Sequence, residues 1–272
     1  GKRIYRVAVL NSKKIFVYRI VYRSLGHKVV GYIVEPRRGI TLPCIIYNRG
    51  GSSDFGMIPH WKPFFQFADI AIHGYILIAS QYSGNDGGEG EDEFGGKDLS
   101  DVIQLYTILK GYKRANISRI GMYGGSRGGM MTYLVLKKVR WIKAAVILSG
   151  LTDLIMNKKN RPEMGHVFKR RFGGSLKSMM ERSSVIWAEK LPKKAPLLLM
   201  HGTADWRVNP LSTLRMAEKL YLNKIPFRLV MMEGADHSLS EFRKEHDRFM
   251  FDWFDKYVKN SSKLPNLKPH GK

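Results

Sequence analysis

The feature that most limits what this chain can fold into is the alternation of short apolar runs with segments of helical periodicity. Six runs of four to seven residues are mostly apolar and lack the alternation of a half-buried strand. Strands that are buried on both faces of a parallel sheet have this composition. The runs are residues 42–47, 75–79, 117–123, 144–148, 197–200 and 227–232.

Helical periods lie between and after these runs. Their apolar side chains recur at intervals of three and four residues, which places them on one face of a helix. The segments are residues 99–109, 130–138, 211–222 and 242–257. Because strands that alternate with helices are joined by right-handed crossovers, the pattern predicts an α/β fold with a doubly wound, mostly parallel sheet.

The beginning of the chain has a different pattern. Residues 15–23 and 28–34 alternate between polar and apolar side chains, and Leu25-Gly26-His27 between them supplies a turn. This arrangement predicts an antiparallel hairpin at the N-terminal end of the sheet.

Two further regions lack a strand pattern. Residues 150–196 contain short helical pieces and are expected to form a small cap over the sheet. Residues 259–272 are polar and rich in lysine and proline, so we expect a basic, flexible tail. The remaining part, residues 1–258, is predicted to be a single α/β domain that includes the cap.

The composition is strongly basic, with 46 lysines and arginines against 23 acidic residues and a formal net charge of +23. Such a charge would suit an acidic partner such as nucleic acid or a membrane surface. The cations are scattered, however, and no nucleic-acid-binding motif accompanies them. We therefore interpret the charge as a solvated basic surface and expect no nucleic-acid partner.

Cysteine content and hydropathy bear on the cellular location of the protein. Cys44 is the single cysteine, lies in an apolar run and is expected to be a buried, inert thiol. No stretch approaches the roughly 18 apolar residues of a membrane span. These features predict a cytoplasmic protein with no membrane span, although a signal peptide removed before Gly1 would leave no trace in the sequence.

The most informative segment is Gly124-Gly125-Ser126-Arg127-Gly128, which satisfies the pattern G-x-S-x-G. An apolar strand precedes it and a helical period follows it, which is the context of the nucleophile elbow of α/β-hydrolases. Small flanking residues let strand and helix approach closely and leave the serine oxygen exposed. The sequence therefore predicts an α/β-hydrolase fold with Ser126 as nucleophile.

A serine hydroxyl needs a base, and the base needs a group that orients it. His237 directly follows the last predicted strand and is the best candidate base, whereas His201 is expected to pack or form hydrogen bonds in a turn. Asp205, after the penultimate strand, is the preferred acid, and Asp153, one strand earlier, is the alternative. Asp236 is too close to His237 in the backbone to hold its ring.

An acyl transfer also needs two donors for the oxyanion. The backbone N–H of Arg127, the residue after the nucleophile, should supply one. The other is expected from the glycine-containing loop 48–51, which follows the strand ending at Tyr47.

Together these segments resemble the catalytic domain of the prolyl oligopeptidase family of serine peptidases. The resemblance covers about residues 15–258 and depends on the order of the motifs more than on any one of them. The motifs are YNRGG (47–51), QYSGNDGGEGEDEFGGKD (81–98), GGSRGGM (124–130), ERSSVIWAEKL (181–191), HGTADWRVNP (201–210) and GADHS (234–238).

The resemblance implies a Ser126–Asp205–His237 triad, with Arg127 as an oxyanion donor. Family members often use a tyrosine hydroxyl as the second donor, but the matching position here is Arg49. We therefore expect the backbone of Arg49 or Gly50 to serve instead.

The resemblance also bears on substrate binding. It places Val208 in the pocket for the side chain next to the cleaved bond, and we add Tyr47 and Leu151 as pocket candidates. Family peptidases usually carry a β-propeller, of which this chain has no repeat of blade length. Selection of a peptide terminus would then come from the cap or from a partner.

Three functions remain open at this point. The first is a peptidase that acts on short peptides through an acyl-enzyme, the second an esterase for small esters, and the third a non-catalytic binding protein on a hydrolase scaffold. No cofactor or metal is expected, the partner is a small peptide or ester substrate, and a homo-oligomer is possible. The acidic loop with Glu89, Glu91, Asp92 and Glu93 is interpreted as a solvated loop, with attraction of a substrate amine as the alternative.

Overall fold

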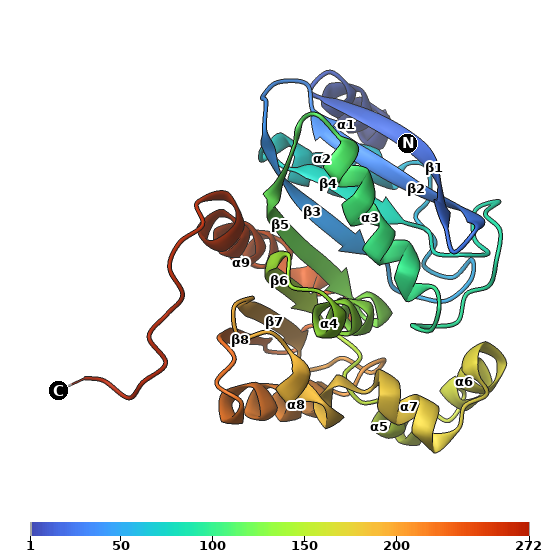
Figure 1. The fold of residues 1–272 in the computed structure, drawn as a ribbon, viewed down its shortest axis with the longest axis vertical. Coiled ribbons are helices and arrows are strands. Elements are labelled where there is room, and N and C mark those ends of the chain that lie inside the picture. The colour runs from blue at the N-terminus through green and yellow to red at the C-terminus, as the bar shows by residue number, and fades with distance from the viewer. Residues whose placement is uncertain (1, 272) are drawn as a thin grey trace. The chain divides into compact units, whose positions relative to one another are not determined.

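The computed structural model describes residues 2–271, with side chains from residue 7 onward. The chain divides into two compact units, residues 1–122 and 123–272, and the boundary falls inside strand β5. Figure 1 shows the elements along the chain.

The first unit contains the predicted N-terminal hairpin and the strands that follow it. Its elements are α1 (Lys2–Ser12), β1 (Ile15–Ser24), β2 (His27–Pro36), β3 (Leu42–Asn48), a 3₁₀ turn (Lys62–Phe64), α2 (Gln66–Ile72), β4 (Ile76–Ser80), α3 (Leu99–Gly111) and the greater part of β5 (Ala115–Gly125). The strand β1 pairs antiparallel with β2, and β2 pairs antiparallel with β4, whereas β3 and β4 are parallel. This confirms the hairpin and the strands 42–47 and 75–79.

The second unit contains the remaining strands and the region expected to be a cap. Its elements after β5 are α4 (Arg127–Lys138), β6 (Ile142–Leu148), α5 (Leu154–Asn160), α6 (Met164–Phe172), α7 (Leu176–Arg182), the 3₁₀ turns Ser184–Ile186 and Ala188–Lys190, β7 (Leu197–Gly202), α8 (Pro210–Leu222), β8 (Phe227–Met232), a 3₁₀ turn (Ser240–Phe242), α9 (Arg243–Phe254) and a π-helical turn (Asp255–Lys259). The strands β6, β7 and β8 pair in parallel.

The strand order is β1-β2-β4-β3-β5-β6-β7-β8. It confirms an α/β fold with a mostly parallel sheet and an antiparallel hairpin at one edge. The residues 150–196 form three short helices and two 3₁₀ turns without a strand, as the sequence predicted.

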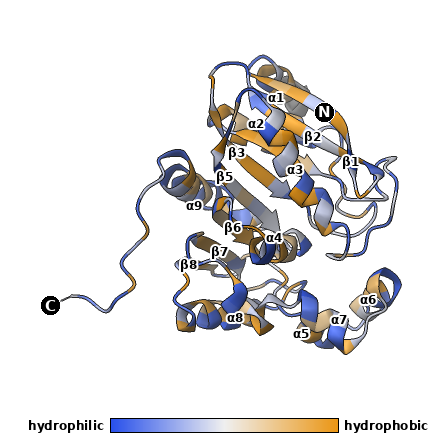
Figure 2. Cartoon of the chain, viewed as in Figure 1, coloured by the Kyte–Doolittle hydropathy of each residue, from blue (hydrophilic) through white to orange (hydrophobic). Residues whose placement is uncertain are grey.

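The apolar runs supply the core. The strands β3, β4 and β7 are buried almost throughout because helices cover them: α2 and α3 pack on strands of the first unit, and α8 packs on β7 and β8. Figure 2 shows the hydrophobic residues on strands such as β3, while helices such as α5 and α8 carry hydrophilic residues. Burial raises the pKa of the Cys44 thiol to about 12, which confirms the expectation of a buried thiol.

Two helices were not predicted. The helix α1 has no acidic residue in its first turn, and α2 is short and mostly apolar, which leaves little of a helical period to recognise. Gly74, with φ of 89°, separates α2 from β4. Among the described residues, none of the helices has both the length and the apolar character needed to cross a bilayer.

Candidate active site

Ser126 occupies a sharp bend between β5 and α4. Its φ of 56° and ψ of −125° lie in a region that costs a non-glycine residue on the order of 1–3 kcal/mol. Backbone contacts hold the bend: the Ser126 N–H donates to the Leu148 carbonyl at 2.9 Å, and the Ser126 carbonyl accepts from Gly129 N–H at 3.0 Å. The strained bend is the predicted strand-to-helix elbow.

The glycines around Ser126 are required by the close approach of β5 and α4. A Cβ at Gly124 would lie 2.2 Å from the Gly128 carbonyl oxygen, which is a severe clash. A Cβ at Gly129 would lie 2.7 Å from the Cα of Gly150, the residue that opens the next loop. Gly124, the first glycine of G-x-S-x-G, and the adjacent Gly129 are therefore required by backbone packing within the second unit.

Asp205 lies in the turn between β7 and α8, with its carboxylate fully buried. Its Oδ1 accepts from the backbone N–H groups of Arg207 at 2.8 Å and Val208 at 3.1 Å. Its Oδ2 lies 2.7 Å from Nδ1 of His237 and 2.9 Å from Nε2 of His201. The carboxylate thus has a partner at each of the roughly four acceptor positions that it offers.

These contacts determine the charge of Asp205. Burial by itself would raise the pKa of this carboxyl group. Hydrogen bonds from His201, His237 and the N–H of Val208 outweigh that effect, and the positive charge of a protonated His237 adds to them. The pKa is therefore held well below the usual range. Asp205 is therefore a carboxylate at neutral pH.

His237 lies in the loop after β8 and is partly exposed, with 14% of its side chain accessible. Because a carboxylate can only accept, the proton of the neutral ring lies on Nδ1, which leaves a basic lone pair on Nε2. Gly202 at the end of β7 allows the base loop to come close, since a Cβ there would lie 2.2 Å from the Ala235 carbonyl oxygen. The predicted acid–base pair is thus present within the second unit.

The other acidic candidates have different partners. The Asp153 carboxylate accepts from the N–H of Met156 at 2.9 Å and caps the first turn of α5. The Asp236 carboxylate accepts from the N–H groups of Ser238 and Ser240, within its own turn. Of the three aspartates, Asp205 is the one whose carboxylate contacts His237.

His201 is the residue that sequence reasoning left without a partner. It is fully buried, and its Nδ1 lies 2.6 Å from Oγ1 of Thr213 on α8. The expectation that His201 forms hydrogen bonds is confirmed, but its contact with Asp205 was not foreseen. Its position four residues before the acid, at the end of the same strand, is the signal that could have suggested it.

The predicted pocket residues lie in both units. Leu151 is buried and its N–H donates to the Ser126 carbonyl at 3.1 Å, and Val208 is buried beside the acid. Tyr47, in the first unit, is buried against Phe67, and its hydroxyl accepts from Lys62 at 2.7 Å. The roles of these residues in substrate binding, and those of Arg127, Arg49 and Gly50 at the oxyanion, remain predictions.

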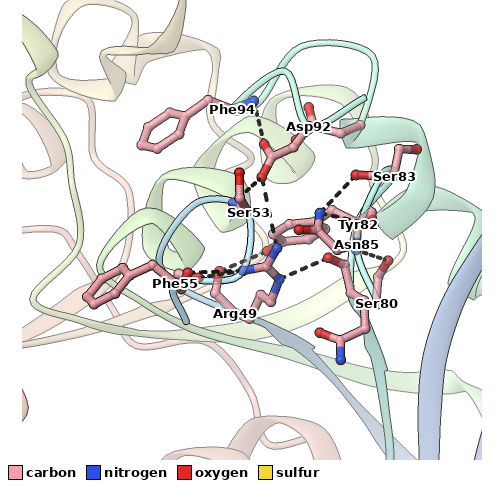
Figure 3. A network of polar contacts seen from close by, with 12 residues as sticks. Arg49, Ser53, Phe55, Ser80, Tyr82, Ser83, Asn85, Asp92 and Phe94 are labelled. Atoms are coloured by element: carbon pink, nitrogen blue, oxygen red, sulfur yellow. Dashed lines mark hydrogen bonds and ion pairs between the residues drawn. The ribbon is translucent and has the colours of Figure 1, made fainter. Parts of the chain in front are cut away.

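In the first unit, the loop after β3 is organised by the side chain of Arg49 (Figure 3). This fully buried guanidinium donates from Nε to the Gln81 carbonyl at 2.9 Å and from Nη1 to the Gly50 carbonyl at 3.2 Å. Its Nη2 lies 3.9 Å from Oδ2 of Asp92, and its Cζ lies 5.0 Å from the centre of the Tyr82 ring. Arg49 thereby joins the loop after β3 to the loop after β4.

The interpretation of the acidic loop as solvated is wrong for Asp92. This carboxylate is buried and accepts from the N–H groups of Ser53 and Phe94 as well as facing Arg49. Glu89 and Glu91 are exposed, as expected. The sequence of this loop did not reveal which of its acidic residues is buried against a guanidinium.

The fold and the acid–base pair define the class of α/β-hydrolases, and comparisons with known proteins define the family. The sequence profile of the prolyl oligopeptidase family matches residues 65–261. The uncharacterized peptidase YtmA of Bacillus subtilis is 31% identical over 77% of this chain and 81% of its own length. The human acylamino-acid-releasing enzyme is 25% identical over 77% of this chain but only 30% of its own length.

Solved structures agree with the fold. The acylaminoacyl peptidase of Pyrococcus horikoshii superposes with a TM-score of 0.78 at 19% identity, over 95% of this chain and 44% of that protein. A puromycin-hydrolyzing peptidase of Mycobacterium tuberculosis superposes with a TM-score of 0.73 at 22% identity, over 88% of this chain and 39% of that protein.

The chain belongs to the prolyl oligopeptidase family of serine peptidases, as its motifs suggested. It spans most of YtmA but less than half of the other relatives described above.

Proposed function

We propose that this protein is a serine peptidase that cleaves short peptides, with Ser126 as nucleophile, His237 as general base and Asp205 as the group that orients the base. The observation that carries the proposal is the 2.7 Å contact between His237 Nδ1 and Asp205 Oδ2. It directs the lone pair of Nε2 away from the acid, where it can accept a proton. The strained bend at Ser126, in the same unit, supports its role as nucleophile.

The proposed reaction follows from these groups. His237 Nε2 takes the proton of the Ser126 hydroxyl as its oxygen attacks the substrate carbonyl, and Asp205 stabilises the imidazolium that forms. The N–H of Arg127, the first residue of α4, would stabilise the oxyanion together with the positive end of that helix. His237 returns the proton to the leaving amine, and it then activates the water that hydrolyses the acyl-enzyme.

Two parts of the proposal concern the rest of the site. The backbone of Arg49 or Gly50 is proposed as the second oxyanion donor, because their loop follows β3 and contains paired glycines. Val208 and Leu151 are proposed to line the pocket for the substrate side chain, with Tyr47 as a further candidate. The printed names of the relatives, a peptidase and an acylamino-acid-releasing enzyme, favour a peptide or acylated amino acid as substrate.

The test is the pair Ser126→Ala and Ser149→Ala. Both serines follow a strand and have positive φ, but the hydroxyl of Ser149 is buried and without a hydrogen-bond partner among the described residues. We expect Ser126→Ala to lower kcat by several powers of ten and to abolish labelling by a fluorophosphonate probe. Ser149→Ala should leave both unchanged. Full activity and labelling in Ser126→Ala would refute the nucleophile.

A substrate panel tests the peptidase assignment against the esterase. Aminoacyl and N-acyl-aminoacyl anilides are compared with short acyl esters, and we expect the anilides to be hydrolysed. Hydrolysis of esters alone would replace the peptidase by an esterase. Salt-sensitive binding to RNA or to anionic vesicles without probe labelling would instead indicate a binding protein that uses its basic surface.

Further proposals concern the setting of the protein. We propose a cytoplasmic location and a peptide rather than a nucleic acid as partner. A homo-oligomer is an open alternative that sedimentation would decide.

A further inference from the structure

Behind the proposed triad, Asp205 contacts a second histidine. Nε2 of His201 lies 2.9 Å from Oδ2 of Asp205, the same oxygen that Nδ1 of His237 contacts at 2.7 Å. The same Nε2 lies 3.0 Å from the carbonyl oxygen of Val208. A carboxylate and a carbonyl are both acceptors, so Nε2 of His201 carries a proton and donates it to them.

The other nitrogen of His201 faces a hydroxyl. Nδ1 lies 2.6 Å from Oγ1 of Thr213, which is buried on α8. In a neutral ring with its proton on Nε2, Nδ1 is an acceptor, and the Thr213 hydroxyl therefore donates to it. The neutral form also suits the full burial of His201, because Asp205 already faces His237 and a second imidazolium would need a further counterion.

The contacts form one directed chain of hydrogen bonds. The Thr213 hydroxyl donates to His201, and His201 donates to Asp205 Oδ2, the oxygen that also contacts His237. With Arg207 and Val208 on Oδ1, the carboxylate cannot rotate without losing a hydrogen bond in the buried interior. A group so constrained presents its oxygen to His237 in one orientation.

We propose that His201, supported by Thr213, is a positioning residue for the acid–base pair, so that the working unit is the tetrad Ser126–His237–Asp205–His201. This inference rests on the proposed function, because it assigns His201 a role in the same reaction. His201 acts in two ways. It sets the orientation of the carboxylate, and it shares the negative charge that His237 would otherwise face alone.

The second effect predicts a change in pH dependence. Without the N–H of His201, the carboxylate charge is concentrated on His237, and the acid limb of the kcat/KM profile moves to higher pH. Other carboxylates near the base are Glu233 and Asp236, on the same loop as His237, and Glu241, which accepts from the Asp236 N–H at 3.5 Å. These are unchanged between the parent and the variants, so a difference in the acid limb of the kcat/KM profile reports on His201.

The first experiment compares His201→Leu with His201→Gln, assayed with the anilide that the parent cleaves best. The Leu side chain has no donor, whereas the Gln amide can place an N–H where Nε2 lies. We expect kcat of His201→Leu to fall about 10- to 100-fold with KM nearly unchanged, because misorientation by a fraction of an ångström to 1 Å has effects of this size. His201→Gln should recover most of the lost activity and the position of the acid limb.

The proposal is overturned if a folded His201→Leu protein has the kcat and the acid limb of the parent. Ser126→Ala serves as the separate control for the proposed function: if it remains active, the serine mechanism fails, whatever His201 does.

A second measurement is made on the parent protein and uses a variant only to assign the signals. The parent protein labelled with ¹⁵N-histidine is examined by NMR between about pH 5 and 9, and the His201 signals are assigned by their loss in His201→Gln. We expect a ring that carries its N–H on Nε2, the nitrogen that faces Asp205. A ring protonated at Nδ1 could not donate to Asp205, and this result would overturn the proposal independently of any activity.

Discussion

The two units each contain a buried carboxylate that anchors a loop, and their partners differ in kind. Asp205 in the second unit contacts two imidazoles and two backbone N–H groups. Asp92 in the first unit faces the guanidinium of Arg49 and accepts from two backbone N–H groups. Asp205 lies three residues after the end of β7, whereas Asp92 lies in the acidic loop, twelve residues after the end of β4.

The difference lies in what the partner can do. The guanidinium of Arg49 is always charged and fully buried, so its ion pair with Asp92 has one charge state and holds the loops together. His237 carries an imidazole, which is able to act as a general base, and part of it reaches the surface. Of the two carboxylates, Asp205 is therefore the one whose side-chain partner is suited to proton transfer.

The largest expected difference between the two carboxylates comes from the same substitution at each, Asp205→Asn and Asp92→Asn. In Asp205→Asn the side-chain amide can no longer hold His237 in the Nδ1–H tautomer, so kcat should fall about 10⁴-fold. In Asp92→Asn, assayed where the protein is folded, kcat should fall by less than about tenfold. Steady-state kinetics on the best anilide measures both.

The size of the fall in kcat for Asp92→Asn also shows whether this carboxylate supports the oxyanion site. Loss of an oxyanion donor typically lowers kcat about 10²- to 10³-fold. A fall of that size would show that the Asp92 carboxylate is needed to hold the proposed oxyanion donor of this loop in place, and the contrast between the two carboxylates would then be wrong.

A second prediction concerns stability at the Arg49 centre. Removing one partner of a buried ion pair leaves the other charge uncompensated, which costs about 3 kcal/mol. We expect Asp92→Asn to lower the free energy of unfolding by about this amount, as measured by urea denaturation with an unchanged m-value. Glu91→Gln, at an exposed site on the same loop, is the matched control and should change it by less than about 0.5 kcal/mol. Equal stabilities for the two variants would contradict the structural role of Asp92.

The pH dependence of stability tests whether the pKa of Asp205 is lowered in the folded protein. Its pKa is lower in the folded protein than the value of about 3.9 in an unfolded chain, so the unfolded state binds a proton first as the pH falls. The stabilisation is complete above about pH 4 to 5 and is lost as the pH drops toward the depressed pKa. Asp205→Asn cannot lose it, so its free energy of unfolding should decrease less than that of the parent between pH 5 and 3. Parallel decreases would show that Asp205 has no depressed pKa.

The smallest expected effect is that of Tyr82→Phe. The Tyr82 hydroxyl donates to the Arg49 carbonyl at 3.0 Å in a buried site, and its loss should cost about 1 kcal/mol of stability. Because this contact supports the Arg49–Asp92 ion pair and not the acid–base pair, kcat should remain within about twofold of the parent. A change in kcat larger than the change in stability would again link this centre to the reaction.

The sequence alone predicted the strands, the elbow and the acid–base pair, because each has a local signature. Buried strands are short apolar runs, the elbow requires glycines at fixed spacing, and acid and base follow consecutive strands. Loop position alone favoured Asp205 over Asp153; in the structure Asp205 contacts His237 and Asp153 caps a helix, and the role of Asp205 in the reaction stays a prediction. The helix α1 was missed although its sequence is amphipathic, and α2 was missed because it is only seven residues long and mostly apolar.

Only the tertiary structure showed which neighbours each polar group has. Thr213 lies twelve residues after His201, yet α8 brings its hydroxyl to the ring and so settles which nitrogen donates to Asp205. Likewise Asp92 and Arg49 lie more than forty residues apart in the sequence. The type of a residue determines which hydrogen bonds it can donate or accept. Its actual partner depends on how distant segments of the chain pack together, which a local sequence pattern does not show.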